Sequence, residues 1–171
     1  MIINYSDKPV IEGQKAIFLA GPTPRKEGEI SWRIEACKFL EENGFDGVVH
    51  VPEYSSWKPR GELDDQANWE RKSMENSSII VFWVPRVIPD MLGLTTNLEI
   101  GYWIHTGRVI YGRPDSAAKI KYVDWIYKLD MEMEPYNNIE DLLLAAISKA
   151  NEIGTDYPKE VLPVQKRIIM K

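Results

Sequence analysis

A carboxylate near the start of a helix is the residue of this sequence best suited to chemistry. The stretch Gly93-Leu94-Thr95-Thr96-Asn97-Leu98-Glu99-Ile100-Gly101 predicts a helix that carries Glu99 about one turn from its beginning. Unpaired backbone N–H groups and the positive end of the helix dipole favour an ionised carboxylate there. Such a group can attack a cationic centre as a nucleophile. It can equally be a charge that only stabilises the helix, so the choice depends on the neighbouring segments.

Strands and helices alternate along the chain around this segment. Short apolar runs predict buried strands at 16–20, 47–51, 79–84 and 108–112. Helical spacing and capping residues predict helices at 31–42, 65–76 (or 68–76), 94–107, 117–127 and 139–152. A fifth strand is poorly signalled, and residues 125–128 compete for it. This alternation predicts an α/β fold, a parallel sheet of about five strands with helices on both faces.

Ligands of such folds bind outside the carboxyl ends of the strands. The segments expected at that edge are 21–26, 52–61 and 85–93, together with the beginning of the Glu99 helix. The polar stretch 54–64 is long for a plain connector, as functional loops often are. The predicted architecture therefore brings together groups that are far apart in the sequence.

Composition restricts the classes of function. The 171 residues suit one domain, and we expect residues 155–171 to form a C-terminal arm. The chain has 21 basic and 26 acidic residues, a net charge of −5 that argues against a nucleic acid polymer as partner. One cysteine and two histidines argue against a disulfide or a zinc site. Residues 1–15 lack a signal-peptide pattern and no apolar run has transmembrane length, so we expect a cytoplasmic protein without membrane contact.

Several segments, taken in order, resemble the nucleoside 2-deoxyribosyltransferase family, in a divergent branch. They span roughly residues 15–115 and are Phe18-Leu19-Ala20-Gly21-Pro22-Thr23-Pro24, Ser31-Trp32-Arg33, Val51-Pro52-Glu53, Trp69-Glu70, Val81-Phe82-Trp83-Val84-Pro85-Arg86 and Leu94–Gly101. The resemblance implies a flavodoxin-like, Rossmann-like fold. It also implies cleavage of the N-glycosidic bond of a 2′-deoxynucleoside, with transfer of the deoxyribosyl group to another nucleobase. No metal or redox cofactor is implied. The implied partners are nucleosides, nucleobases and further copies of the chain, in a dimer or larger homo-oligomer.

The resemblance implies three catalytic carboxyl groups. Glu99 matches the nucleophile, which would trap C1′ as a covalent glycosyl intermediate. Glu70 falls where the family has an aspartate that holds the sugar and the catalytic centre; Asp65 competes for this position, and an exposed helix charge is the plain alternative. Asp90 lies near the acid that gives a proton to the departing base, although its spacing to Glu99 differs from the family by a few residues.

Five residues are expected to bind substrate. The loop after the first predicted strand would approach the sugar and base closely, although a plain turn also explains its sequence. An aromatic side chain beside Glu70 would wall the base pocket, and an amide in the Glu99 helix would contact substrate or only begin the helix. These residues are Gly21, Pro22, Thr23, Trp69 and Asn97.

Other residues keep two interpretations. Arg25 and Lys26 could hold a 5′-phosphate or be solvated charges. Trp57 and Trp83 could wall the base pocket or, for Trp83, belong to the core, and His50 and His105 are interpreted as structural. The basic tail at 163–171 does not match the base-recognising C-terminus of the better-known transferases. This mismatch weakens the case for transfer to a second base more than the case for cleavage of the glycosidic bond.

Two other functions therefore stay open. One is a 2′-deoxynucleoside 5′-monophosphate N-glycosidase, in which water replaces the acceptor base and Arg25, Lys26 or Ser31 holds the phosphate. The other is a non-catalytic nucleotide-binding or sensor protein that has kept the fold.

Overall fold

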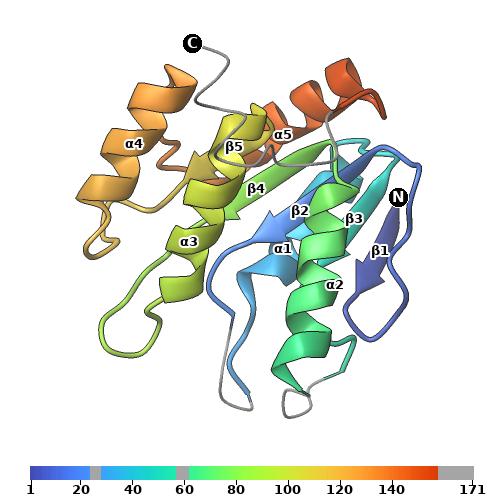
Figure 1. The fold of residues 1–171 in the computed structure, drawn as a ribbon, viewed down its shortest axis with the longest axis horizontal. Helices are drawn as coiled ribbons and strands as arrows, with labels where there is room; N and C mark the ends of the chain where they lie inside the picture. Colours follow the sequence, from blue (N-terminus) through green and yellow to red (C-terminus); the bar gives the residue numbers. More distant parts are fainter. Residues whose placement is uncertain (24–27, 57–61, 158–171) are drawn as a thin grey trace, which may run out of the picture.

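Five strands form one parallel sheet in the computed structural model, which describes residues 1–23, 28–56 and 62–157 (Figure 1). The order across the sheet is β1-β3-β2-β4-β5, and each neighbouring pair is parallel. The four strands after β1 are buried along their whole length, as continuous apolar runs in a parallel sheet require. The predicted flavodoxin-like α/β class is confirmed. The strands are β1 (Ile2–Tyr5), β2 (Ala16–Ala20), β3 (Val48–Val51), β4 (Ile79–Trp83) and β5 (Val109–Gly112).

The fifth strand lies at the N-terminus, so the competing segment suggested by the sequence was wrong. β1 pairs with β3 at the edge of the sheet, and of its four residues only Asn4 is buried. A short edge strand of this kind lacks the continuous apolar run that marks the other four. Residues 125–128 lie inside helix α4 (Lys121–Met131), where Val123 and Tyr127 face the core four residues apart. That spacing belongs to a helix rather than a strand.

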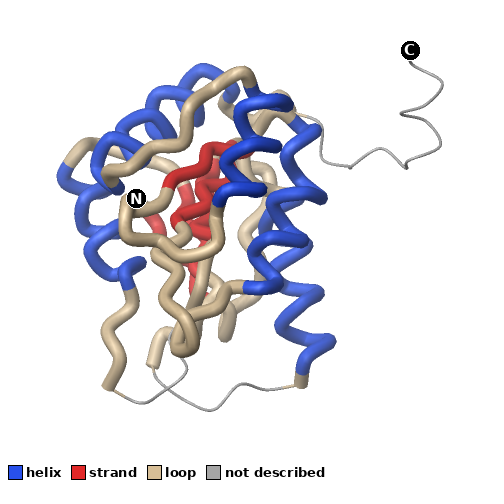
Figure 2. Tube along the Cα trace, turned by 90° about the vertical axis from the view of Figure 1, so that its left-hand side faces the viewer, coloured by secondary structure: helices blue, strands red, loops and turns tan. Residues whose placement is uncertain are grey.

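Helices cover both faces of the sheet (Figure 2). One face packs against α1 (Trp32–Glu42) and α5 (Ile139–Ile153). The other packs against α2 (Leu63–Glu75), α3 (Leu94–Trp103) and α4. A short 3₁₀ helix, Ile104–Thr106, extends α3 and ends at Gly107, as the sequence predicted for the end of this helix.

Three helix beginnings agree with the sequence, including that of α3 at Leu94, and two do not. Ser31 caps α1 by accepting a hydrogen bond from the Arg33 backbone N–H, and α5 begins at its predicted position. Helix α2 begins at Leu63, ahead of both predicted starts. Helix α4 begins at Lys121 instead of residue 117, because a turn occupies the preceding residues and Lys119 has a φ of 52° that no α-helix accepts.

The strand order creates a switch point between β2 and β4. The chain runs from β2 through α1 to β3 on one side, and then crosses through α2 to β4 on the other side of β2. The segments that leave β2 and β4 therefore diverge at their carboxyl ends and open a crevice between them.

None of the helices in the three described ranges combines the length and the apolar composition that crossing a bilayer requires.

Candidate active site

A pocket of about 810 Å³, counting the space open to solvent at its mouth, lies at this switch point. Its walls come from the end of β2 with the loop that follows, from the first half of α2, and from the segment that leads into α3. The lining residues are Phe18, Ala20, Gly21, Pro22, Thr23, Pro52, Gln66, Ala67, Glu70, Met91, Leu92, Gly93, Leu94, Thr95, Thr96 and Glu99.

Five of the eight site residues expected from the sequence line this pocket. Three belong to the loop after β2, at 21–23, and two are carboxylates, Glu70 from α2 and Glu99 from α3. Asp65, which competed with Glu70, is exposed and is not among the lining residues of the described chain. The structure therefore brings Glu70 and Glu99 to one site and leaves Asp65 outside it.

The other three expected residues are not among the described residues that line the pocket. The Trp69 indole N–H donates to the Lys8 carbonyl at 2.7 Å, and the ring packs against Phe18 and the edge of His50. Trp69 thus holds the segment after β1. Asp90 is exposed in the turn that Val87 and Met91 close.

Asn97 accepts a hydrogen bond from Arg86 at 2.5 Å. The buried Arg86 guanidinium also donates to the carbonyls of Gly93 and Lys119, so it fastens the first turn of α3. Asn97 therefore helps to fasten the first turn of α3, and its contact with substrate stays a prediction. Trp83 is 7% exposed and belongs to the core. Arg25, Lys26, Trp57 and the tail at 163–171 lie outside the described residues.

Glu99 lies where the sequence placed it, as the sixth residue of a helix that begins at Leu94. The backbone N–H groups that a helix leaves unpaired belong to its first four residues, here 94–97. The effect of the helix dipole fades within the first turn, so the beginning of the helix is only a weak source of stabilisation for this carboxylate.

Two glycines let the walls of the pocket meet closely. A Cβ built on Gly21, whose φ is 145°, would lie 2.1 Å from the Trp83 carbonyl oxygen, so β2 and β4 touch there through backbone. A Cβ on Gly93, whose φ is 57°, would lie 2.7 Å from Cγ of Pro22. The loop after β2 therefore packs directly against the beginning of α3, and glycine is needed at both contacts.

Arg33 has no role that the sequence alone predicted, and it is 1% exposed behind the pocket wall. Its guanidinium donates to the carbonyls of Leu19 (2.8 Å), Gly21 (2.7 Å) and Pro22 (3.3 Å), and to Glu53 at 2.6 Å. Burial lowers the pKa of Arg33, while the charges of Glu53, Glu70 and Glu99 act in the opposite direction. The signal was present in the Ser31-Trp32-Arg33 and Val51-Pro52-Glu53 motifs, but an arginine on a helix normally suggests solvent exposure.

Glu70 is oriented by a neighbour on its own helix. The Gln66 side-chain amide donates to Glu70 at 2.7 Å and to the Pro52 carbonyl at 3.4 Å. This bridge links α2 to the segment after β3 and directs one Glu70 oxygen. Two carboxylates at a small-molecule pocket suit chemistry at a sugar carbon, where a positive charge develops.

His50 takes the structural role that its sequence suggested. It is fully buried on β3, and its Nδ1 lies 2.9 Å from the Asn4 side-chain oxygen on β1. Burial lowers the pKa of His50 to about 4, so the ring is neutral at pH 7.

The fold and the pocket together define a flavodoxin-like α/β protein with a carboxylate-lined small-molecule site. Comparison with protein families agrees with this class. A family described as "Nucleoside 2-deoxyribosyltransferase like" matches residues 14–117, which is more than half of the chain and includes every lining residue of the pocket. The chain belongs to this family, and membership indicates an enzyme of the nucleoside deoxyribosyltransferase-like type. A search among curated proteins found no match.

Proposed function

We propose that this protein is a cytoplasmic enzyme of nucleoside salvage that moves a 2-deoxyribosyl group from one nucleobase to another. The observation that carries the proposal is the pairing of Glu70 and Glu99 in one pocket at the switch point of the sheet. The family match over the same residues supports it.

Glu99 is the proposed nucleophile. One of its carboxylate oxygens forms a bond to C1′ of the deoxynucleoside as the C1′–N bond breaks, and the electron pair of that bond goes to the departing base. The reaction passes through an oxocarbenium-like state and gives a covalent glycosyl ester. A nitrogen of the incoming base then attacks C1′ from the other face and releases Glu99, with net retention. Glu70 would hold a sugar hydroxyl or orient Glu99.

The departing base needs a proton, and the incoming base must lose one. Asp90 is the acid that the family resemblance proposes for both transfers. Its turn adjoins Met91, which lines the pocket, although the carboxyl group itself is exposed. Its role is therefore tested separately from that of Glu99.

The reaction is tested by product analysis. The protein is incubated with a 2′-deoxynucleoside and a different free base, and chromatography follows the appearance of a new deoxynucleoside. Glu99→Gln should abolish product formation, a loss of at least about 10⁴-fold, because the amide cannot attack C1′. Mass spectrometry of the quenched wild-type protein should show one added deoxyribosyl group.

Three outcomes separate the candidate functions. A new deoxynucleoside supports transfer. Free deoxyribose or deoxyribose 5-phosphate without a new nucleoside would make the protein a hydrolase. Unchanged activity and ligand response in Glu99→Gln would show that Glu99 is not the nucleophile, and the central claim of the proposal would fail.

A further inference from the structure

Arg33 connects three segments behind the pocket: the end of β2, the loop that follows it, and the end of β3. Its Nε donates to Leu19 at the end of β2, and its two terminal nitrogens donate to Gly21 and Pro22 in the following loop. Gly21 and Pro22 line the pocket. A planar fork with several donors satisfies these carbonyls together, which a lysine ammonium could not do with the same geometry.

The same guanidinium is anchored to the end of β3. Glu53 accepts from Arg33 at 2.6 Å and also from the Ser31 hydroxyl at 2.8 Å. Ser31 caps α1, so the ion pair joins the beginning of this helix to the ends of two strands. Its partners are mostly withdrawn from water, with side-chain exposures of 1% for Arg33 and 17% for Glu53.

Arg33 also lies behind a wall of the pocket that holds the two carboxylates, because its guanidinium donates to Gly21 and Pro22, which line this pocket together with Glu70 and Glu99. The charges of Glu53, Glu70 and Glu99 act to raise the pKa of Arg33, against the lowering by burial. The guanidinium of Arg86 also lies near this edge, bonded to Gly93 and Asn97 at the first turn of α3. Carboxylates that share a pocket disfavour each other's ionised form, and a nearby cation reduces this effect.

We propose that Arg33 is a positioning residue of the active site, an inference that rests on the proposed function. Its fork holds the Gly21–Thr23 wall in place, and its charge favours the ionised, nucleophilic form of Glu99. Both effects act through other groups, since Arg33 is not among the described residues that line the pocket.

Two substitutions separate the effect of the planar set of donors from the effect of the positive charge. Arg33→Lys keeps a positive charge but loses the planar set of donors, and Arg33→Met removes both at similar length. Since Arg33→Met leaves Glu53 as an unpaired, largely buried charge, Arg33→Met/Glu53→Met serves as a second variant if the single one does not fold.

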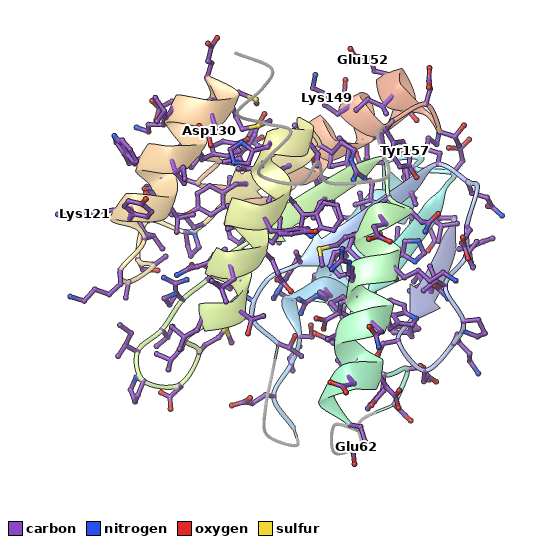
Figure 3. The ribbon with its side chains drawn as sticks, in the orientation of Figure 1. Glu62, Lys121, Asp130, Lys149, Glu152 and Tyr157 are labelled. Carbon is purple, nitrogen blue, oxygen red and sulfur yellow. The ribbon has the colours of Figure 1, made fainter. Side chains whose placement is uncertain are left out.

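Arg108 offers a matched control at the opposite edge of the sheet. It is also 1% exposed, and it donates to the carbonyls of Met74 (3.0 Å) and Ser77. Its guanidinium lies over the ring of Tyr157, which Figure 3 places at the far end of the molecule from Glu62, the residue before α2. Arg108→Met therefore removes a comparable buried arginine away from the pocket.

The first measurement does not depend on catalysis. Carbon-13 NMR of protein labelled at glutamate follows the titration of each carboxyl group, and the Glu99 signal is the one missing from Glu99→Gln. In Arg33→Met, or in its double variant, Glu99 should titrate roughly one pH unit higher than in the wild type. In Arg33→Lys and Arg108→Met it should titrate within a few tenths of a unit of the wild type.

The second measurement is the pH dependence of kcat/KM. Activity requires ionised Glu99, so loss of the nearby cation should move the acid limb upward by a similar amount in the methionine variants only. Arg33→Lys should keep the position of the limb but lower kcat/KM roughly 10²-fold, because the displaced wall misplaces the substrate. Urea unfolding of each variant reports the loss of stability separately.

An upward shift of the Glu99 titration in the Arg33 methionine variants, absent from Arg108→Met, supports the inference. An unchanged titration, or the same shift in Arg108→Met, overturns the electrostatic part of the inference, and an unchanged kcat/KM in Arg33→Lys overturns the part that concerns the wall. If the titration shifts but the wild-type protein cleaves no deoxynucleoside, the proposed function fails while the electrostatic role of Arg33 stands.

Discussion

Glu70 and Glu99 come from different helices, yet both side chains reach one pocket, with Gln66 directing the first and the charge of Arg33 acting on both. At the scale of single residues, the site is therefore a set of carboxylates whose neighbours determine their orientation and charge. Glu70 and Glu99 are half-buried in the pocket, whereas Asp90 is exposed in a turn beside it, and that difference makes their roles separable by experiment.

Asp90→Asn and Glu70→Gln should respond differently to the leaving group. If Asp90 supplies the proton, Asn at this position should lower kcat/KM roughly 10²-fold for an ordinary base. The loss should nearly vanish for a cationic N-methylated purine, which departs without a proton. Glu70→Gln should lower kcat/KM for both substrates alike, because this group would act on the sugar or on Glu99. Equal losses in Asp90→Asn for both substrates would refute its role as the acid.

At the scale of elements, two contacts fix the geometry of the sheet around the site. One is the approach of the loop after β2 to the beginning of α3, through Gly93 and Pro22. The other is the pairing of β1 with β3, where Asn4 meets His50. The first contact forms the pocket, and the second holds the edge of the sheet.

Gly93→Ala should destabilise the fold and impair the site together. A left-handed φ of 57° strains alanine, and its Cβ would press on Pro22 at 2.7 Å, so we expect a loss of about 1–3 kcal/mol in the free energy of unfolding. Gly107→Ala is the control: its φ is 71°, and no atom of the described residues lies within 4 Å of the added Cβ. Urea unfolding and kcat/KM should show the smaller effect for Gly107→Ala. Equal effects of the two substitutions would mean that the contact with Pro22 contributes to neither stability nor activity.

His50 should make the stability of the fold depend on pH. Its pKa is about 4 in the folded protein and 6.5 as the ordinary value, so the unfolded chain binds more protons between these limits. Stability should therefore be fully present above pH 6.5 and fall as the pH drops towards 4, by up to about 1.4 kcal/mol per pH unit. His50→Gln should remove this part of the pH dependence in urea unfolding at several pH values. If stability depends on pH in His50→Gln as strongly as in the wild type, other groups cause that dependence.

At the scale of the whole molecule, the outer surface of α3 and α4, which are neighbouring helices in Figure 1, exposes apolar and aromatic side chains. Three come from each helix, namely Leu94, Leu98, Tyr102, Tyr122, Trp125 and Leu129. Tyr102 also accepts a hydrogen bond from Arg71 of α2. Several exposed apolar side chains on helices of one face often mark a contact with another protein. Leu94 also lines the pocket, so these exposed side chains reach the site.

We propose that a second copy of the chain covers this surface, in line with the homo-oligomer that the family resemblance implies. Sedimentation equilibrium should show a dimer or larger assembly, and Leu98→Glu should shift it to monomer because a charge would enter the contact. Leu144→Glu, on α5 at the other face, should behave as the wild type, since Leu144 is 46% exposed but far from this surface. A monomeric wild type at all concentrations would contradict the proposal.

Local patterns were sufficient for much of the fold. The four buried strands and the helix that carries Glu99 appeared as apolar runs and capping signals, because burial on both faces of a parallel sheet leaves a continuous apolar stretch. The ordered motifs between residues 14 and 117 also sufficed to identify the family. The edge strand β1 was not predicted, because a half-exposed strand of four residues has no continuous apolar run in its sequence.

Only the tertiary structure decided which charged groups share the site. It placed Glu70 in the pocket and Asp65 outside it, turned Trp69 towards Lys8, and buried Arg33 against three carbonyls and Glu53. Periodicity reports which face of an element is apolar, and it is a property of neighbouring residues. The convergence of charges depends on the order of strands around the switch point and on partners supplied by distant elements, and a local pattern carries no record of either.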